Sequence, residues 1–134
     1  MVTTDETILA VEAVLALPFL LLGLSHCIQK QMWVDFFSEL AARGPSGVVW
    51  RTFMLELWPA VLIVVFHQDW RWPGLIITLY GHLLMVKVGL SVLAPELGLK
   101  SLRQVERVGL QGFLVAGGIL IVLGLLCGYR ALGL

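Results

Sequence analysis

The stretch PGLIITLYGHLLMVKVGLSVLA, residues 73–94, decides the fold of this chain. At about 1.5 Å per residue, a helix of this length crosses the ~30 Å hydrocarbon core of a bilayer. It also contains Lys87, and a lysine at membrane depth costs roughly 2.5–3.5 kcal/mol on insertion scales. The stretch therefore predicts a transmembrane helix whose lysine meets a partner or a polar cavity instead of lipid.

The composition places the whole chain in a membrane. Its 134 residues are 59% hydrophobic and 13% charged, and the mean hydropathy is +0.93. Soluble domains are nearer 45–50% apolar and about 25% charged. The formal net charge is zero, so the chain lacks the basic surface typical of nucleic-acid binding. We expect an integral membrane protein whose surroundings are the lipid bilayer, with no nucleic-acid partner.

Three further apolar runs cover residues 7–28, 48–67 and 108–129. Backbone polar groups in lipid must be satisfied within the segment itself, so single runs of about 20 residues form helices. The sequence predicts an all-α, four-transmembrane-helix bundle, with residues 1–134 forming a single integral membrane domain.

The connection at residues 29–43 carries a helical pattern of its own. Apolar side chains recur at i, i+3, i+4 and i+7, at Trp33, Phe36, Phe37 and Leu40. This spacing is typical of an amphipathic helix that lies in the membrane interface. We expect a connector that covers the edge of the bundle; a gate or a docking helix for a partner is the alternative.

The distribution of Lys and Arg predicts the orientation. The side with the first and third connections has six of them, and the side with both termini has two: Lys30, Arg43, Arg51, Lys100, Arg103 and Arg107 against Arg71 and Arg130. Because cytoplasmic loops carry the excess of positive charge, we expect both termini to lie outside.

Depth along the helices suggests a partner for Lys87. Glu56 lies about 12 Å above the cytoplasmic start of the second run, and Lys87 about 10 Å above the cytoplasmic end of the third. The two runs are joined by a very short connection, so they form antiparallel neighbours. Opposite charges at nearly equal depth predict a buried ion pair, which removes most of the burial cost.

Helical phase extends this pair into a candidate ligand site. At 100° per residue, Tyr80, Lys87 and Ser91 fall within about 40° of one another. His82 belongs to a second stripe, which we expect to face the first or fourth helix. The candidate ligand-binding residues are Glu56, Tyr80, Lys87, Ser91, His82, His26 and Arg51.

Several functions fit such a site. Ionisable groups inside membranes usually mark binding or transport, so we expect a pocket that binds or transports a small ligand. The alternatives are a structural or accessory subunit of a larger membrane complex, and an enzyme acting on a lipid or quinone with His26 as acid or base beside Arg51. A buried pair that only fixes helix register would also fit.

No cofactor or catalytic residue can be named from the sequence. The three histidines, His26, His67 and His82, fall at three expected depths. A zinc site needs three or four converging ligands, so we expect no metal site.

Small residues recur along the fourth run, as Gly112-xxx-Ala116 and Gly124-xxx-Gly128. This spacing lets helix backbones approach closely. It predicts either packing inside one bundle or the face of a homodimer.

Three strings suggest a family. GLSHCIQKQMWVDFF (residues 23–37), FHQDWRWPGLIITLYG (66–81) and APELGLKSL (94–102) resemble uncharacterised small bacterial four-helix membrane proteins, of broadly DoxX-like hydropathy. The resemblance implies a bacterial inner-membrane protein and no particular activity. His82 departs from the pattern, where an aromatic residue is expected. The positions that the resemblance marks are Ser25, His26, His67, Trp70, Gly81, Lys87 and Pro95.

Overall fold

The computed structural model describes residues 4–134, without the side chains of Val105 and Glu106. The elements are α1 (Asp5–Ile28), α2 (Lys30–Ala42), α3 (Pro45–Arg51), the π-helix η1 (Thr52–Leu57), α4 (Trp58–Phe66), α5 (Gly74–Leu93), α6 (Pro95–Arg103) and α7 (Val105–Ala131). Four stretches are long and apolar enough to cross a membrane: Asp5–Ile28, Pro45–Phe66, Gly74–Leu93 and Arg107–Ala131. The predicted all-α bundle of a multi-pass membrane protein is confirmed.

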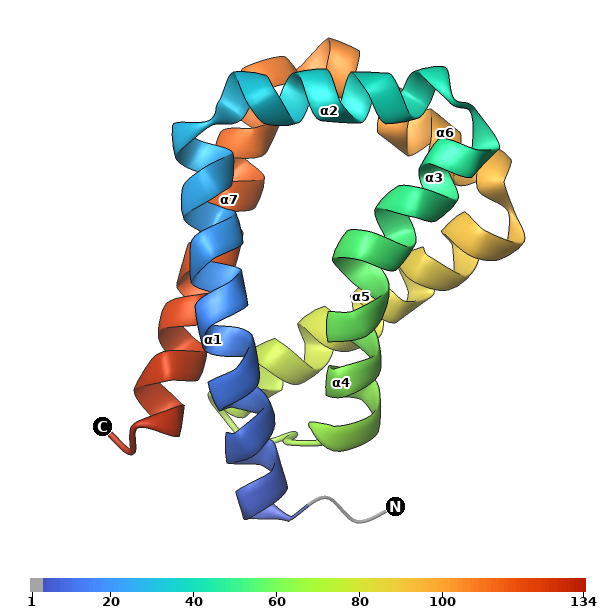
Figure 1. Cartoon of the computed structure of the whole chain (residues 1–134). Coiled ribbons are helices and arrows are strands. Elements are labelled where there is room, and N and C mark those ends of the chain that lie inside the picture. Colours follow the sequence, from blue (N-terminus) through green and yellow to red (C-terminus); the bar gives the residue numbers. More distant parts are fainter. Residues whose placement is uncertain (1–3) are drawn as a thin grey trace.

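The spans form two arms (Figure 1). Helices α1 and α7 run side by side in one arm, and α3, η1 and α4 pair with α5 in the other. Helix α2 lies across one end and joins the arms, with α6 packed beneath it. The start of α1, the end of α7 and the α4–α5 loop lie at the opposite end, which we call the terminal end.

Glycines bring α1 and α7 into close contact. A Cβ on Gly23 would lie 2.7 Å from the Gly117 carbonyl oxygen, and one on Gly124 would lie 2.7 Å from Leu20 Cγ. These distances are too short for a side chain, so the arm depends on small residues. Packing inside one bundle is thus confirmed for Gly124, whereas a homodimer along the same helix stays a prediction.

Apolar clusters pack the helices together at both ends of the bundle, and the one at the terminal end combines residues of both arms. Near the terminal end the cluster contains Val11, Leu15, Phe19, Ile63, Ile77, Leu123 and Cys127. At the α2 end the cluster contains Leu40, Ala41, Val48, Leu99 and Leu102. Helix α2 therefore turns its apolar side onto the bundle, as expected for a connector that covers its edge.

Helix α6 lies where the sequence predicts a plain connection. The local signals are present, because Pro95 and Glu96 fall in the first turn, and Lys100 and Arg103 in the last. A nine-residue helix is too short to be stable alone, so it depends on tertiary packing. That packing comes from Leu99 and Leu102, which are buried at the α2 end.

The π-helix η1 was also missed, and it changes which residues meet. Pro59 has no N–H to donate to the carbonyl four residues earlier, which gives a physical reason for the wider i→i+5 repeat just before it. In an α-helix, Arg51 and Glu56 would point about 140° apart. In a π-helix, residues five apart stack on one side, so both side chains reach the same place.

Candidate functional site

The predicted ion pair between Glu56 and Lys87 is confirmed. Lys87 Nζ on α5 donates to Glu56 Oε1 on η1 at 3.0 Å. The Glu56 side chain is 11% exposed, whereas that of Lys87 is 49% exposed. The prediction that the pair is buried thus holds for the carboxylate only, because about half of the lysine side chain is accessible.

A second cation reaches the same carboxylate. Arg51 Nε lies 3.4 Å from Glu56 Oε1, and Arg51 Nη2 donates to Ser91 Oγ at 3.4 Å. Within the described residues, Arg51 Nε and Glu56 Oε2 are buried without hydrogen-bond partners. We call Arg51, Glu56 and Lys87 the charge triad; two cations and one carboxylate give it a net charge of +1.

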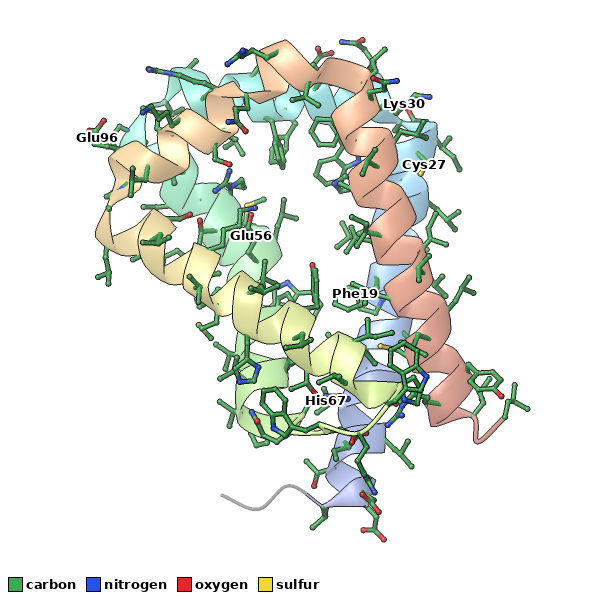
Figure 2. All side chains as sticks on the ribbon, turned by 180° about the vertical axis from the view of Figure 1, so that it is seen from behind. Phe19, Cys27, Lys30, Glu56, His67 and Glu96 are labelled. Atoms are coloured by element: carbon green, nitrogen blue, oxygen red, sulfur yellow. The ribbon has the colours of Figure 1, made fainter. Side chains whose placement is uncertain are left out.

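A cavity of about 250 Å³ lies against the charge triad, between the two arms. Figure 2 shows Phe19 and Glu56 on facing arms beside this space. The wall is mainly apolar and aromatic: Phe19, Leu22, His26, Phe37, Leu55, Glu56, Trp58, Tyr80, Leu84, Lys87, Phe113, Ala116, Ile119 and Leu120. The polar groups are few and converge from both arms.

The cavity unites four of the seven predicted site residues. His26, Glu56, Tyr80 and Lys87 line it. Ser91 instead borders a second cavity of about 270 Å³ between α5 and α6, which Lys87 also lines. Arg51 lies behind Glu56 and is 2% exposed, so it acts on the cavity only through its neighbours.

The prediction that His82 faces the first or fourth helix is wrong. Its Nδ1 donates to the Thr78 carbonyl oxygen at 2.8 Å, and its ring lies 5.3 Å from that of Trp70. The α4–α5 loop, which carries Trp70, folds over this face of α5. His82 therefore meets the loop, and it is absent from the residues that line the described cavity.

His26 is held in a fixed orientation. Its Nδ1 donates to the Leu22 carbonyl oxygen at 2.7 Å, and its ring stacks on Trp33 with 4.3 Å between centroids. Trp33 in turn donates from Nε1 to Ser25 Oγ at 2.9 Å. Helix α2 thus fixes one histidine on the cavity wall.

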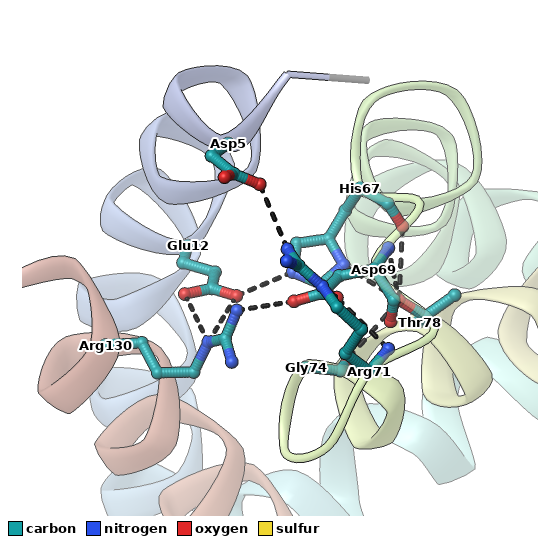
Figure 3. Close-up of polar contacts among 8 residues, drawn as sticks. All are labelled: Asp5, Glu12, His67, Asp69, Arg71, Gly74, Thr78 and Arg130. Carbon is teal, nitrogen blue, oxygen red and sulfur yellow. Dashed lines mark hydrogen bonds and ion pairs between the residues drawn. The ribbon is translucent and has the colours of Figure 1, made fainter. Parts of the chain in front are cut away.

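A second polar group, which the sequence does not predict, lies at the terminal end (Figure 3). Glu12 is fully buried and accepts from Arg130 Nε at 2.9 and 3.0 Å. It also accepts from His67 Nε2 at 2.7 Å, and Arg130 Nη2 donates to Asp69 Oδ2 at 2.6 Å. We call Glu12, His67, Asp69 and Arg130 the Glu12 cluster; it ties α1, α7 and the α4–α5 loop together.

Neighbours complete the Glu12 cluster. Thr78 Oγ1 lies 3.0 Å from His67 Nδ1 and donates to the Asp69 carbonyl oxygen at 2.8 Å. Burial raises the pKa of Asp69, but hydrogen bonds from Arg71 and Arg130 and the charge of Arg130 outweigh it, so this pKa lies below its ordinary value. Because these groups satisfy one another's hydrogen bonds and charges, we interpret the cluster as structural.

Comparisons with known proteins identify no relative: no protein-family model, no curated protein and no solved structure matches this chain. The described residues contain no group of three or more His, Cys, Asp and Glu side chains placed to hold a metal ion. The site must therefore be judged from its own chemistry.

Proposed function

We propose that the protein binds a small amphipathic molecule inside the membrane and helps it to cross or to reach a partner. The single observation that supports this best is the cavity between the arms, with the half-exposed side chain of Lys87 on a mainly apolar and aromatic wall. Ligand pockets usually combine apolar walls with a small number of placed polar groups. Lys87 would hold the polar group of the ligand, with Glu56 as its counter-ion and Tyr80 beside it.

The size of the cavity limits the ligand. About 250 Å³ is many times the ~10–15 Å³ that one water molecule needs on the same measure of cavity volume. Pockets for drug-sized ligands measure roughly 300–1,000 Å³, so this cavity suits a ligand at the small end of that range. The proposed ligand is therefore small. We also propose a bacterial inner-membrane location, and the distribution of Lys and Arg favours an orientation with both termini outside.

Replacing Lys87 with Met tests this function. The variant keeps the length and apolar stem of the side chain, and Arg51 still neutralises Glu56, so we expect it to fold. Binding of small amphipathic molecules, measured by calorimetry with the protein in lipid nanodiscs, should weaken about tenfold or more, since hydrogen bonds to charged groups contribute roughly 1.5–3 kcal/mol. Unchanged binding by a folded variant would remove Lys87 from the site.

Filling the cavity provides an independent control. Ala116 lines it, so Ala116→Trp should abolish binding by occupying the space. Val115 is 63% exposed on the neighbouring position and is absent from the cavity wall, so Val115→Trp should leave binding intact. Equal binding by both variants would show that the molecule dissolves in the bilayer only.

An accessory subunit of a larger membrane complex is the second candidate. A Cβ on Gly118 would meet no atom within 4 Å, so this part of α7 can accept another helix, from a second copy or from a different protein. Purification in mild detergent separates the two: a stable partner of another sequence supports the accessory role. For an enzyme acting on a lipid or quinone, we expected His26 and Arg51 to line one cleft; only His26 borders the cavity.

A further inference from the structure

We infer that the cavity selects an anionic head group, a carboxylate on a small apolar body, and that Arg51 makes this selection without touching the ligand. The inference rests on the proposed function and names the class of ligand. It follows from the way in which two cations share one carboxylate in the charge triad.

The first step is charge. Arg51 and Lys87 both lie within 3.4 Å of the same oxygen, Glu56 Oε1. The triad therefore keeps one uncompensated positive charge, which is costly inside a membrane. A bound monoanion makes the site neutral, whereas a bound monocation would double its excess positive charge.

The second step is access. Lys87 is 49% exposed and Arg51 is 3% exposed, so the excess charge is presented by Lys87. Lys87 borders both the cavity between the arms and the one between α5 and α6. An ammonium group has three donors, and Glu56 takes one of them. Donors remain for a carboxylate.

The third step is exchange. Arg51 Nε and Glu56 Oε2 are both buried without a hydrogen-bond partner, although the two side chains are already in ion-pair contact. A small rotation of either side chain would join an unused donor to an unused acceptor. Glu56 can thus exchange its ion pair with Lys87 for one with Arg51 when a ligand carboxylate binds Lys87. Without Arg51, Glu56 would hold Lys87 and repel the anion.

The probes are octanoate, octanol and octyltrimethylammonium, which share a chain and differ in head-group charge. Binding is measured by calorimetry with the full-length protein in nanodiscs of zwitterionic lipid, with empty nanodiscs subtracted. The intact protein should bind octanoate at least tenfold more tightly than octanol, and octyltrimethylammonium most weakly. Octanol or the cation binding as tightly as octanoate would overturn the inference.

Variants of Arg51 give the sharpest test, because this residue is absent from the cavity wall. Arg51→Met should weaken octanoate binding about tenfold and leave octanol binding unchanged, whereas Arg51→Lys should keep both. In the double variant Arg51→Met/Glu56→Gln, Lys87 is again a free cation, so octanoate affinity should return to within about threefold of the original. Failure of the double variant to recover would exclude the exchange.

Glu56→Gln alone keeps the test decisive if Arg51→Met does not fold. It should bind octanoate as tightly as the intact protein or more tightly; weaker binding would show that Glu56 contacts the ligand and would contradict the inference. Adding phosphatidylglycerol to the nanodiscs should not displace octanoate. Displacement would assign the site to a lipid head group instead.

Failure of the proposed function looks different. In that case each of the three probes would bind the Ala116→Trp and Val115→Trp variants equally, whatever the charge of its head group. Loss of the charge preference alone, with the response to Ala116→Trp retained, would overturn only the selection of an anion.

Discussion

Glu12 is a fully buried carboxylate that pairs with Arg130 from the other end of the chain, an arginine that it shares with Asp69. Removing one partner of a buried ion pair leaves the other charge uncompensated and typically costs about 3–5 kcal/mol. We therefore expect Arg130→Met to lower the free energy of unfolding by about 3 kcal/mol. Denaturant titration in detergent, followed by circular dichroism, measures the effect.

A double-mutant cycle provides the control for this pair. Glu12→Gln/Arg130→Met removes both charges and should recover much of the stability lost in Arg130→Met, because Glu12 is then neutral and the remaining buried carboxylate, Asp69, still pairs with Arg71. If the loss of unfolding free energy in the double variant equals the sum of the losses in the two single variants, Glu12 and Arg130 stabilise the fold independently.

Asp69 predicts a dependence of stability on pH. Its pKa in the folded protein lies below the ordinary value of 3.8. Between the two values, the unfolded chain binds a proton that the folded chain does not, so stability rises with pH in this window. The contribution is complete above about pH 4 and is lost as the pH falls through the folded pKa.

Unfolding curves from pH 5 downward test this contribution. Asp69→Asn should flatten the loss of stability in acid. Asp35→Asn is a matched surface control, because Asp35 is exposed and pairs only with Gln31 of its own helix among the described side chains. Equal curves for Asp69→Asn and the original protein would locate the acid sensitivity elsewhere.

At the scale of elements, α1 and α7 behave as one unit. Gly124 has room for no side chain against Leu20, whereas Gly118 on the same helix meets no atom within 4 Å. Gly124→Val should therefore destabilise the fold by roughly 1–3 kcal/mol through overpacking, and Gly118→Val should cost much less. Thermal unfolding in detergent compares the two; equal losses would mean that α1 and α7 do not pack as described.

The sequence predicted the spans and the Glu56–Lys87 pair because both depend on regular geometry. Hydrophobic runs give spans directly, and a constant rise per residue converts position into depth. Regular α-helical geometry does not predict the contact between Arg51 and Glu56, because the π-helix before Pro59 shifts the phase of the helix. No spacing rule for α-helices places residues five apart on one side.

The Glu12 cluster was within reach of the same reasoning. Glu12 is an ionisable residue in an apolar run, and Arg130 lies at a comparable level in the last run, so depth could have paired them as it paired Glu56 with Lys87. His67 and Asp69 could not have been placed this way. They lie in the α4–α5 loop, where no repeating geometry fixes the direction of a side chain.

At the scale of the whole molecule, the two-arm arrangement could not be predicted. The order of helices in a bundle depends on close contacts such as Gly23 against Gly117, and hydropathy alone contains no information about them. The cavity is a product of this arrangement, because its wall combines residues from both arms. The sequence could therefore suggest polar residues for a site but not the aromatic wall that faces them.

The start of α1 and the end of α7 lie at one end of the bundle, which gives a topology experiment. The positive-charge bias predicts that this end lies outside the cytoplasm. Alkaline phosphatase, which is active only outside, should be active when fused after Leu134, and a fluorescent protein that folds only in the cytoplasm should stay dark there. A fluorescent fusion at Leu134 would reverse the predicted orientation.

Lys87 borders the cavity between α5 and α6 together with Leu83, Val86 and Leu90, which are more than half exposed on the outer face of α5. A solute that arrives from the bilayer along this route never leaves hydrocarbon. Lipid tails are as apolar as leucine, so moving its chain from lipid into the protein releases almost no free energy. Transfer from lipid into the protein therefore discriminates little between apolar chains, so the choice between solutes depends on the head group and on the charge triad.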